Sequence, residues 1–116
     1  MKLKAINYGQ VWSDDRRIII KKDRDYISYK EDNYALRVSI YRILEPHMIV
    51  VDCSEITGWF PPHHGEPLPK SREIEILKRI EEALILLKVP YKLENKPKGY
   101  TNFSLKLEHY LFGNNS

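Results

Sequence analysis

A proline-rich stretch divides this chain more sharply than any other feature. Residues 59–69 read Trp-Phe-Pro-Pro-His-His-Gly-Glu-Pro-Leu-Pro, and four of these eleven residues are prolines. Proline has no backbone N–H to donate, so the stretch cannot lie inside a helix or a sheet. We therefore expect an ordered loop or an extended cover that joins two differently built halves of the chain.

The half that follows carries the clearest helical pattern. Apolar residues recur at helical spacing from about residue 70 until Pro90, and charged residues fill the positions between them. A helix of about 18 residues would be about 27 Å long, which is enough to cross several strands. Its expected apolar face consists of Ile76, Leu77, Ile80, Ala83, Leu84 and Leu87.

The half that precedes it reads as a series of short strands. Apolar and polar side chains alternate along residues 34–41, so one face of that strand should be buried and the other wet. The run around Met48–Val51 is apolar on both faces, as in a central strand covered on both sides. The expected strands are Met1–Tyr8, Arg16–Lys22, Tyr26–Lys30, Tyr34–Ile40 and His47–Cys53.

Two more strands are expected after the helix. Tyr91–Glu94 is one, and the alternation of Phe103, Leu105 and Leu107 favours another. We therefore expect residues 1–116 to form a single α+β domain, in which an antiparallel-rich sheet of about five to seven strands packs on one long amphipathic helix.

Composition and charge narrow the class of protein. The 116 residues match the usual size of one domain, and the formal net charge of +3 is too small to indicate nucleic acid by itself. The single cysteine, Cys53, excludes an internal disulfide and fits a reducing compartment. No apolar stretch is long enough to cross a membrane or to act as a signal peptide, so we expect a cytoplasmic protein.

Reactive groups are few. The five glycines do not form a phosphate-binding cluster, and the apolar run around Cys53 should raise the pKa of its thiol. Asp52 and Glu55, three residues apart on an extended chain, would point to opposite faces. We expect no catalytic residue, no cofactor and no enzyme activity.

The adjacent residues His63 and His64 are the strongest remaining candidates for chemistry. Histidine titrates near neutral pH, and both lie close to Glu66, which would suit general acid or base catalysis. Side chains of adjacent residues diverge on an extended backbone, and with one cysteine in the chain we expect no metal site. The alternative is that these rings pack against aromatic neighbours and hydrogen-bond to the backbone.

Arginines and aromatic residues are interleaved along the expected strands. This pattern suits either a protein interface or single-stranded nucleic acid. The candidate partner-binding residues are Tyr29, Lys30, Arg37, Tyr41 and Arg42 in the strands, with Trp59, His63, His64 and Glu66 in the proline-rich stretch. For Trp59, an anchoring role in the core is the alternative.

The segment Ser-Glu-Ile-Thr-Gly-Trp-Phe-Pro-Pro-His-His-Gly-Glu-Pro-Leu, residues 54–68, precedes an expected helix that ends in Leu-Leu-Lys-Val-Pro-Tyr. It resembles a bacterial immunity-protein family, immunity protein seventy-four of the polymorphic-toxin nomenclature. That family has a strand, an aspartate-containing turn, a tryptophan, two prolines and a Gly/Asn-Glu-Pro before its helix. The resemblance covers about Arg16 to Glu94, and the first strand and residues 95–116 lie outside it.

The resemblance implies a protein that is made beside a secreted toxin and neutralises it by tight binding, without chemistry of its own. The expected partner is then the C-terminal domain of the cognate toxin. The alternative is a small RNA- or DNA-binding domain that uses the Tyr/Arg face of the sheet. Free sheet edges would also permit a homodimer.

Overall fold

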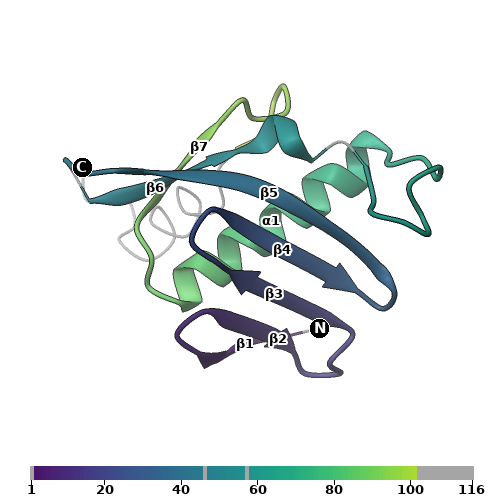
Figure 1. Cartoon of the computed structure of the whole chain (residues 1–116), viewed down its shortest axis with the longest axis horizontal. Helices are drawn as coiled ribbons and strands as arrows, with labels where there is room; N and C mark the ends of the chain where they lie inside the picture. The colour runs from purple at the N-terminus through teal and green to yellow at the C-terminus, as the bar shows by residue number, and fades with distance from the viewer. Residues whose placement is uncertain (1, 46, 57, 102–116) are drawn as a thin grey trace.

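The chain folds into a seven-stranded sheet with one helix on one face, in a computed structural model that describes residues 2–45, 47–56 and 58–101 (Figure 1). The strands lie in chain order, and all neighbours are antiparallel except β6 and β7. The elements are β1 (Leu3–Asn7), β2 (Gln10–Ser13), β3 (Ile18–Lys22), β4 (Tyr26–Glu31), β5 (Tyr34–Ile43), β6 (Met48–Asp52), the 3-10 turn η1 (Cys53–Glu55), α1 (Lys70–Leu86) and β7 (Tyr91–Glu94). The expected α+β class is confirmed.

Helix α1 belongs to the crossover between the parallel strands β6 and β7. Parallel neighbours cannot be joined by a tight turn, so the chain leaves the end of β6, passes through the proline-rich stretch and returns along α1. The helix ends where Lys88 adopts a left-handed backbone with φ of 58°, just before Pro90. No helix among the described residues is long and apolar enough to cross a membrane.

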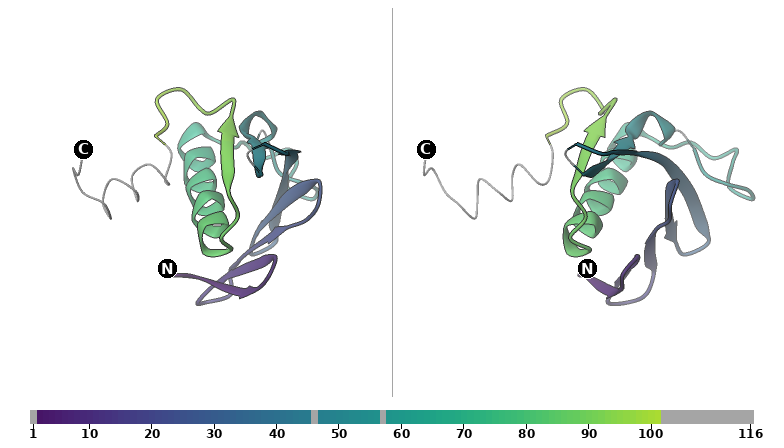
Figure 2. Two further views of the ribbon diagram at one scale, coloured as in Figure 1. Left: turned by 90° about the vertical axis from the view of Figure 1, so that its left-hand side faces the viewer. Right: turned by 60° about the vertical axis from the view of Figure 1, so that its left-hand side comes forward.

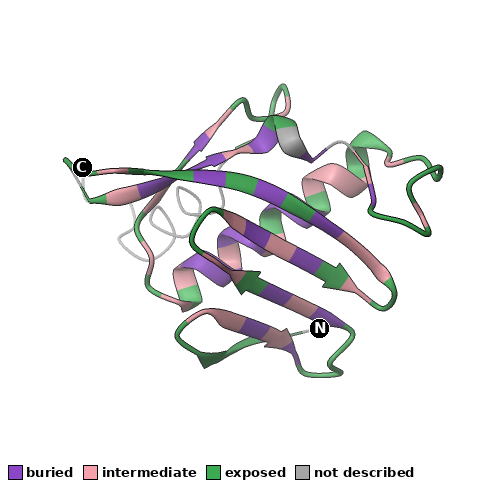
Figure 3. Cartoon of the chain, viewed as in Figure 1, coloured by how far each residue is buried: buried purple, intermediate pink, exposed green. Residues whose placement is uncertain are grey.

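The sheet buries the face that carries α1. Leu36, Val38 and Ile40 of β5 are buried, whereas Arg37 and Tyr41, which alternate with them, are exposed (Figure 3). The expected alternation is confirmed. The sheet curves around the helix (Figure 2), and the helix contributes Ile76, Leu77, Ile80, Ala83 and Leu84 to the core.

Strand β6 is covered on both sides, as its sequence predicts. Ile49, Val50 and Val51 are all buried, although Val50 faces away from α1. On that side the hydroxyl of Tyr41 on β5 donates a hydrogen bond of 2.7 Å to Glu94 on β7, and this bond crosses β6.

The N-terminal region differs from the expectation. The predicted strand over Met1–Tyr8 is confirmed as β1, but β1 pairs in a hairpin with β2, which was missed. The chain turns at Tyr8 and Gly9, and glycine suits the second position because a side chain there would meet the Lys22 carbonyl oxygen at 3.1 Å. The expected strand around Phe103–Leu107 lies outside the described residues.

The proline-rich stretch is fastened to the exposed edge of β5. The first half of β5 pairs with β4 and the second half with β6, which leaves the edge beside Ala35 without a strand. The backbone N–H of Phe60 donates a 2.7 Å hydrogen bond to the Ala35 carbonyl oxygen. This bond brings Phe60 next to the sheet.

Candidate partner-binding surface

The face of the sheet opposite α1 is the candidate binding surface, and we call it the open face. In Figure 1 this face is turned toward the viewer, with α1 behind it. Strand register and alternation assign the side chains of Lys4, Trp12, Ile19, Lys21, Tyr26, Ser28, Lys30, Ala35, Arg37, Ser39, Tyr41 and Lys92 to it. Phe60 of the proline-rich stretch adds an exposed ring beside them.

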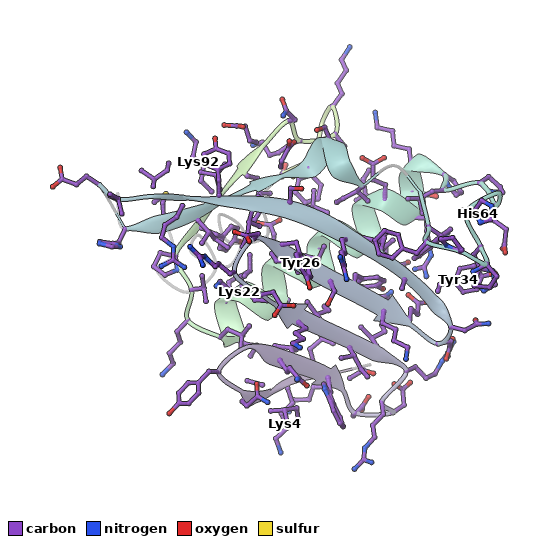
Figure 4. The ribbon with its side chains drawn as sticks, in the orientation of Figure 1. Lys4, Lys22, Tyr26, Tyr34, His64 and Lys92 are labelled. Atoms are coloured by element: carbon purple, nitrogen blue, oxygen red, sulfur yellow. The ribbon has the colours of Figure 1, made fainter. Side chains whose placement is uncertain are left out.

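Arg37 is held between two aromatic rings at the centre of the open face. Its guanidinium carbon lies 4.2 Å from the centre of the Tyr26 ring and 5.5 Å from that of Phe60. Tyr26 lies over the middle of the sheet in Figure 4. Cation–π contacts favour a planar guanidinium on an aromatic face, so Arg37 is oriented without being neutralised.

The basic residues of the open face are free of carboxylate partners. Within residues 2–45, 47–56 and 58–101, no ion pair involves Lys4, Lys21, Lys30, Arg37 or Lys92. The acidic groups lie together at one end, where Asp52 accepts hydrogen bonds from Ser54 and Asn95 and Glu94 accepts one from Tyr41. The open face is therefore positive over β1–β5 and negative at the ends of β6 and β7.

On the α1 side of the sheet, near the β4–β5 turn, the charged groups are paired with one another. We call this cluster the Glu31 network. Glu31 pairs with Arg72 at 2.5 Å and with Arg79 at 2.8 Å, and it accepts a 2.6 Å hydrogen bond from Tyr29. Burial alone would raise the pKa of Glu31, but the hydrogen bonds from Arg72 and Tyr29 and the charges of both arginines outweigh burial and hold it below its ordinary value. These groups tie β4 to α1.

A second cluster, which we call the loop clamp, fixes the proline-rich stretch to β5. The Tyr34 ring stacks on His63 with ring centres 3.7 Å apart and meets the edge of Trp59 at 5.1 Å. Glu66 accepts a 2.6 Å hydrogen bond from the Tyr34 hydroxyl and also bonds to Nδ1 of His63. The bonds from Tyr34 and His63 lower the pKa of Glu66, and Glu66 raises that of Tyr34.

A cleft of about 430 Å³ separates the loop clamp from the start of α1. Glu31, Asp32, Glu66 and Glu75 line it, and each of these carboxylates already has a partner in Arg72, Arg17, Tyr34 or His63. Because the carboxylates that line this cleft are paired within the protein, they are suited to holding the proline-rich stretch and α1 together.

Three of the predicted strand residues lie where expected: Lys30, Arg37 and Tyr41 are exposed on the open face. The placement of Tyr29 is wrong, because it pairs with Leu36 on the α1 side and is fully buried. The placement of Arg42 is also wrong. Arg42 follows Tyr41 directly, so alternation turns it to the α1 side, where it is exposed near Lys88.

The loop residues divide in a similar way. Trp59 is buried, with 7% of its surface exposed, so the anchoring alternative is confirmed. His63 and Glu66 hold the loop through their bonds to each other and to Tyr34, whereas His64 is exposed (Figure 4). Sequence reasoning missed Phe60, because only the bond to Ala35 reveals that this residue reaches the sheet.

Reactive groups remain sparse in the described part of the chain. Burial, and then the charge of Glu81, raise the pKa of the Cys53 thiol to about 12, and only 1% of the residue is exposed, so it is a poor nucleophile. Asp52 caps η1 by accepting a hydrogen bond from the Ser54 N–H. No group of three His, Cys, Asp or Glu residues suited to a metal occurs among these residues.

Comparisons with known proteins add no relative: no family model, no curated protein and no solved structure matches the chain.

Proposed function

We propose that this chain is an immunity protein that neutralises a cognate toxin domain by binding it through the open face of the sheet. The observation that carries the proposal is Arg37, an unpaired arginine held between Tyr26 and Phe60 on an uncovered face. Arginine and aromatic residues supply most of the binding energy at protein interfaces, and they do so best when they are already oriented.

Exposed apolar area on the same face supports a protein partner. Tyr41 is 49% exposed and Phe60 is 42% exposed. Burying such rings against a partner removes apolar surface from water, which is the general driving force of association. The charged groups would then set orientation and specificity.

The proline-rich stretch serves the binding surface indirectly. Its clamp residues are engaged with one another, and prolines reduce the entropy that is lost when a loop is ordered. In this role the stretch delivers Phe60 to Arg37 and keeps it there.

Single-stranded nucleic acid is the second candidate, favoured by the unpaired lysines and the aromatic residues of the open face. Two features count against it. Tyr26 and Phe60 both have Arg37 over their rings, and the acidic end at Asp52 and Glu94 would repel a phosphate backbone that continues across the sheet.

The test is binding to the toxin-like domain encoded by the neighbouring reading frame, with an inactivated domain titrated calorimetrically. We expect a one-to-one complex that survives added salt and that weakens roughly a hundredfold when Arg37 and Tyr41 are both replaced by alanine. Lys78→Ala, an exposed position on α1, is the control and should bind normally. Absence of any toxin-like neighbour, or a neighbour that does not bind, would contradict the proposal.

A further inference from the structure

We infer, on the basis of the proposed function, that the partner presents an acidic protein surface to the open face and that Arg37 binds one of its carboxylates. The charge pattern of the face sets the partner's chemistry. Unpaired basic side chains cover β1–β5, and the carboxylates at the end of β6 and β7 are already engaged. Complementarity requires negative charge over the first region and none over the second.

Arg37 is built as the anchor of this contact. Guanidinium and carboxylate groups match as two parallel hydrogen bonds, provided that the guanidinium plane is fixed. The guanidinium carbon lies over the Tyr26 ring, 4.2 Å from its centre, and over the Phe60 ring, 5.5 Å from its centre. A guanidinium that stacks on a ring through its face keeps the N–H donors at its edge for a ligand. Tyr26 and Phe60 are therefore positioning residues.

Small side chains and basic residues surround Arg37. Its register partner is Ser28, and Ala35 and Ser39 flank it on its own strand, so small side chains form the floor. Lys21 pairs with Ser28 from the next strand, which places it two strands, about 10 Å, from Arg37. Ser28 lies between them, and Lys30 is two residues, about 7 Å, further along β4, so a partner with several carboxylates meets three cations together.

A protein carboxylate fits this arrangement better than a phosphodiester chain. A single strand gains much of its affinity by stacking bases on open aromatic rings. Here Tyr26 and Phe60 face Arg37, Arg16 lies over Trp12 at 5.6 Å, and the hydroxyl of Tyr41 is bonded to Glu94. The rings orient arginines, which leaves side-chain carboxylates as the matching ligand.

The experiment is an NMR titration of the whole protein with a short peptide of alternating glutamate and serine. The same peptide with glutamine in place of glutamate is the first comparison, and a uridine oligonucleotide of equal length is the second. We expect the acidic peptide to shift the backbone signals of Ser28, Lys30 and Arg37 and the side-chain Nε–H of Arg37. The glutamine peptide should shift none of them.

Variants test the anchor. Arg37→Ala should weaken peptide binding roughly tenfold and Arg37→Lys roughly fivefold, because lysine keeps the charge but cannot form the paired bonds. Arg17→Ala is the matched control: Arg17 is exposed but already bonded to Asp32 at 2.8 Å, so its loss should leave peptide binding unchanged. Circular dichroism checks that each variant is folded.

Three results would overturn the inference: equal binding of the glutamine peptide, tighter binding of the oligonucleotide, or undiminished binding by Arg37→Lys. Because the peptide assay needs no toxin, it can fail while the toxin still binds. In that case the proposed function stands with a partner of different chemistry.

Discussion

The Glu31 network and the open face use the same residue types in opposite ways. Around Glu31, two arginines, a tyrosine and carboxylates satisfy one another between β4 and α1. Arg37 lies with two aromatic rings on the surface, and no carboxylate of the described residues forms an ion pair with it. A charge that is paired within the chain stabilises the fold, whereas an oriented charge that is not paired remains available to another molecule.

The two regions meet at the proline-rich stretch. Its loop clamp lies on the Glu31 side, and Phe60 reaches the Arg37 side. Substitutions in the network or the clamp should therefore change global or local stability, and substitutions on the open face should change binding.

The largest expected effect comes from Trp59→Ala. The buried ring is in contact with Tyr34 and with the guanidinium of Arg72, so its removal should lower the free energy of unfolding by about 4 kcal/mol. Urea denaturation measures this loss. Trp12→Ala, on the half-buried tryptophan of the open face, is the matched control and should lose less than half as much; equal losses would contradict the contrast.

Glu31→Gln should have the next largest effect. It removes the carboxylate charge between Arg72 and Arg79 and should cost about 2 kcal/mol of unfolding free energy in the same denaturation assay. Asp32→Asn, on the neighbouring residue, breaks an exposed pair with Arg17 and should cause no detectable change. If Asp32→Asn proved the more damaging of the two, the assignment of Glu31 would be wrong.

The pH dependence of the free energy of unfolding, compared between wild type and Glu31→Gln, tests the same assignment. The pKa of Glu31 lies below its ordinary value of 4.5 in the fold, so as pH falls the unfolded chain takes up this proton first. The stabilisation is present above that value and is lost as pH falls through the lowered pKa, so the gap between wild type and Glu31→Gln should narrow as pH falls below 4.5. A gap that stays constant or widens in urea denaturations over this range would count against the network.

Tyr34→Phe should have the smallest effect. It removes the hydrogen bond to Glu66 but keeps the ring that stacks on His63. Global stability should be unchanged, while amide hydrogen exchange at Glu66, whose N–H donates to the His63 carbonyl, becomes faster. Protection that is identical to wild type would show that the hydroxyl does not hold the loop.

The sequence predicted the buried faces correctly wherever a single periodic pattern of apolar residues determines them. Alternation along β5 and helical spacing along α1 both predicted the buried faces. It failed where the outcome depended on the parity of one position: Tyr29 and Lys30 were assigned to one face, but adjacent strand residues must point apart.

Longer-range features could not be read from the sequence at all. Strand β2 depends on the turn at Tyr8 and Gly9, and Phe60 reaches Arg37 because its backbone bonds to Ala35 at the open edge of β5. Both are contacts between segments whose individual patterns are ambiguous. The proposed immunity function likewise depends on a partner that lies outside this chain.

The most direct test combines the basic residues of the open face in one protein, Lys21→Ala, Lys30→Ala and Arg37→Ala together, and measures its affinity for the toxin domain by calorimetry. We predict a free energy of unfolding in urea within about 1 kcal/mol of wild type, because none of the three is in an ion pair and the contacts of Arg37 with Tyr26 and Phe60 are at the surface. The affinity should be lower by roughly a thousandfold. A folded triple variant that binds the toxin as tightly as wild type would contradict the account.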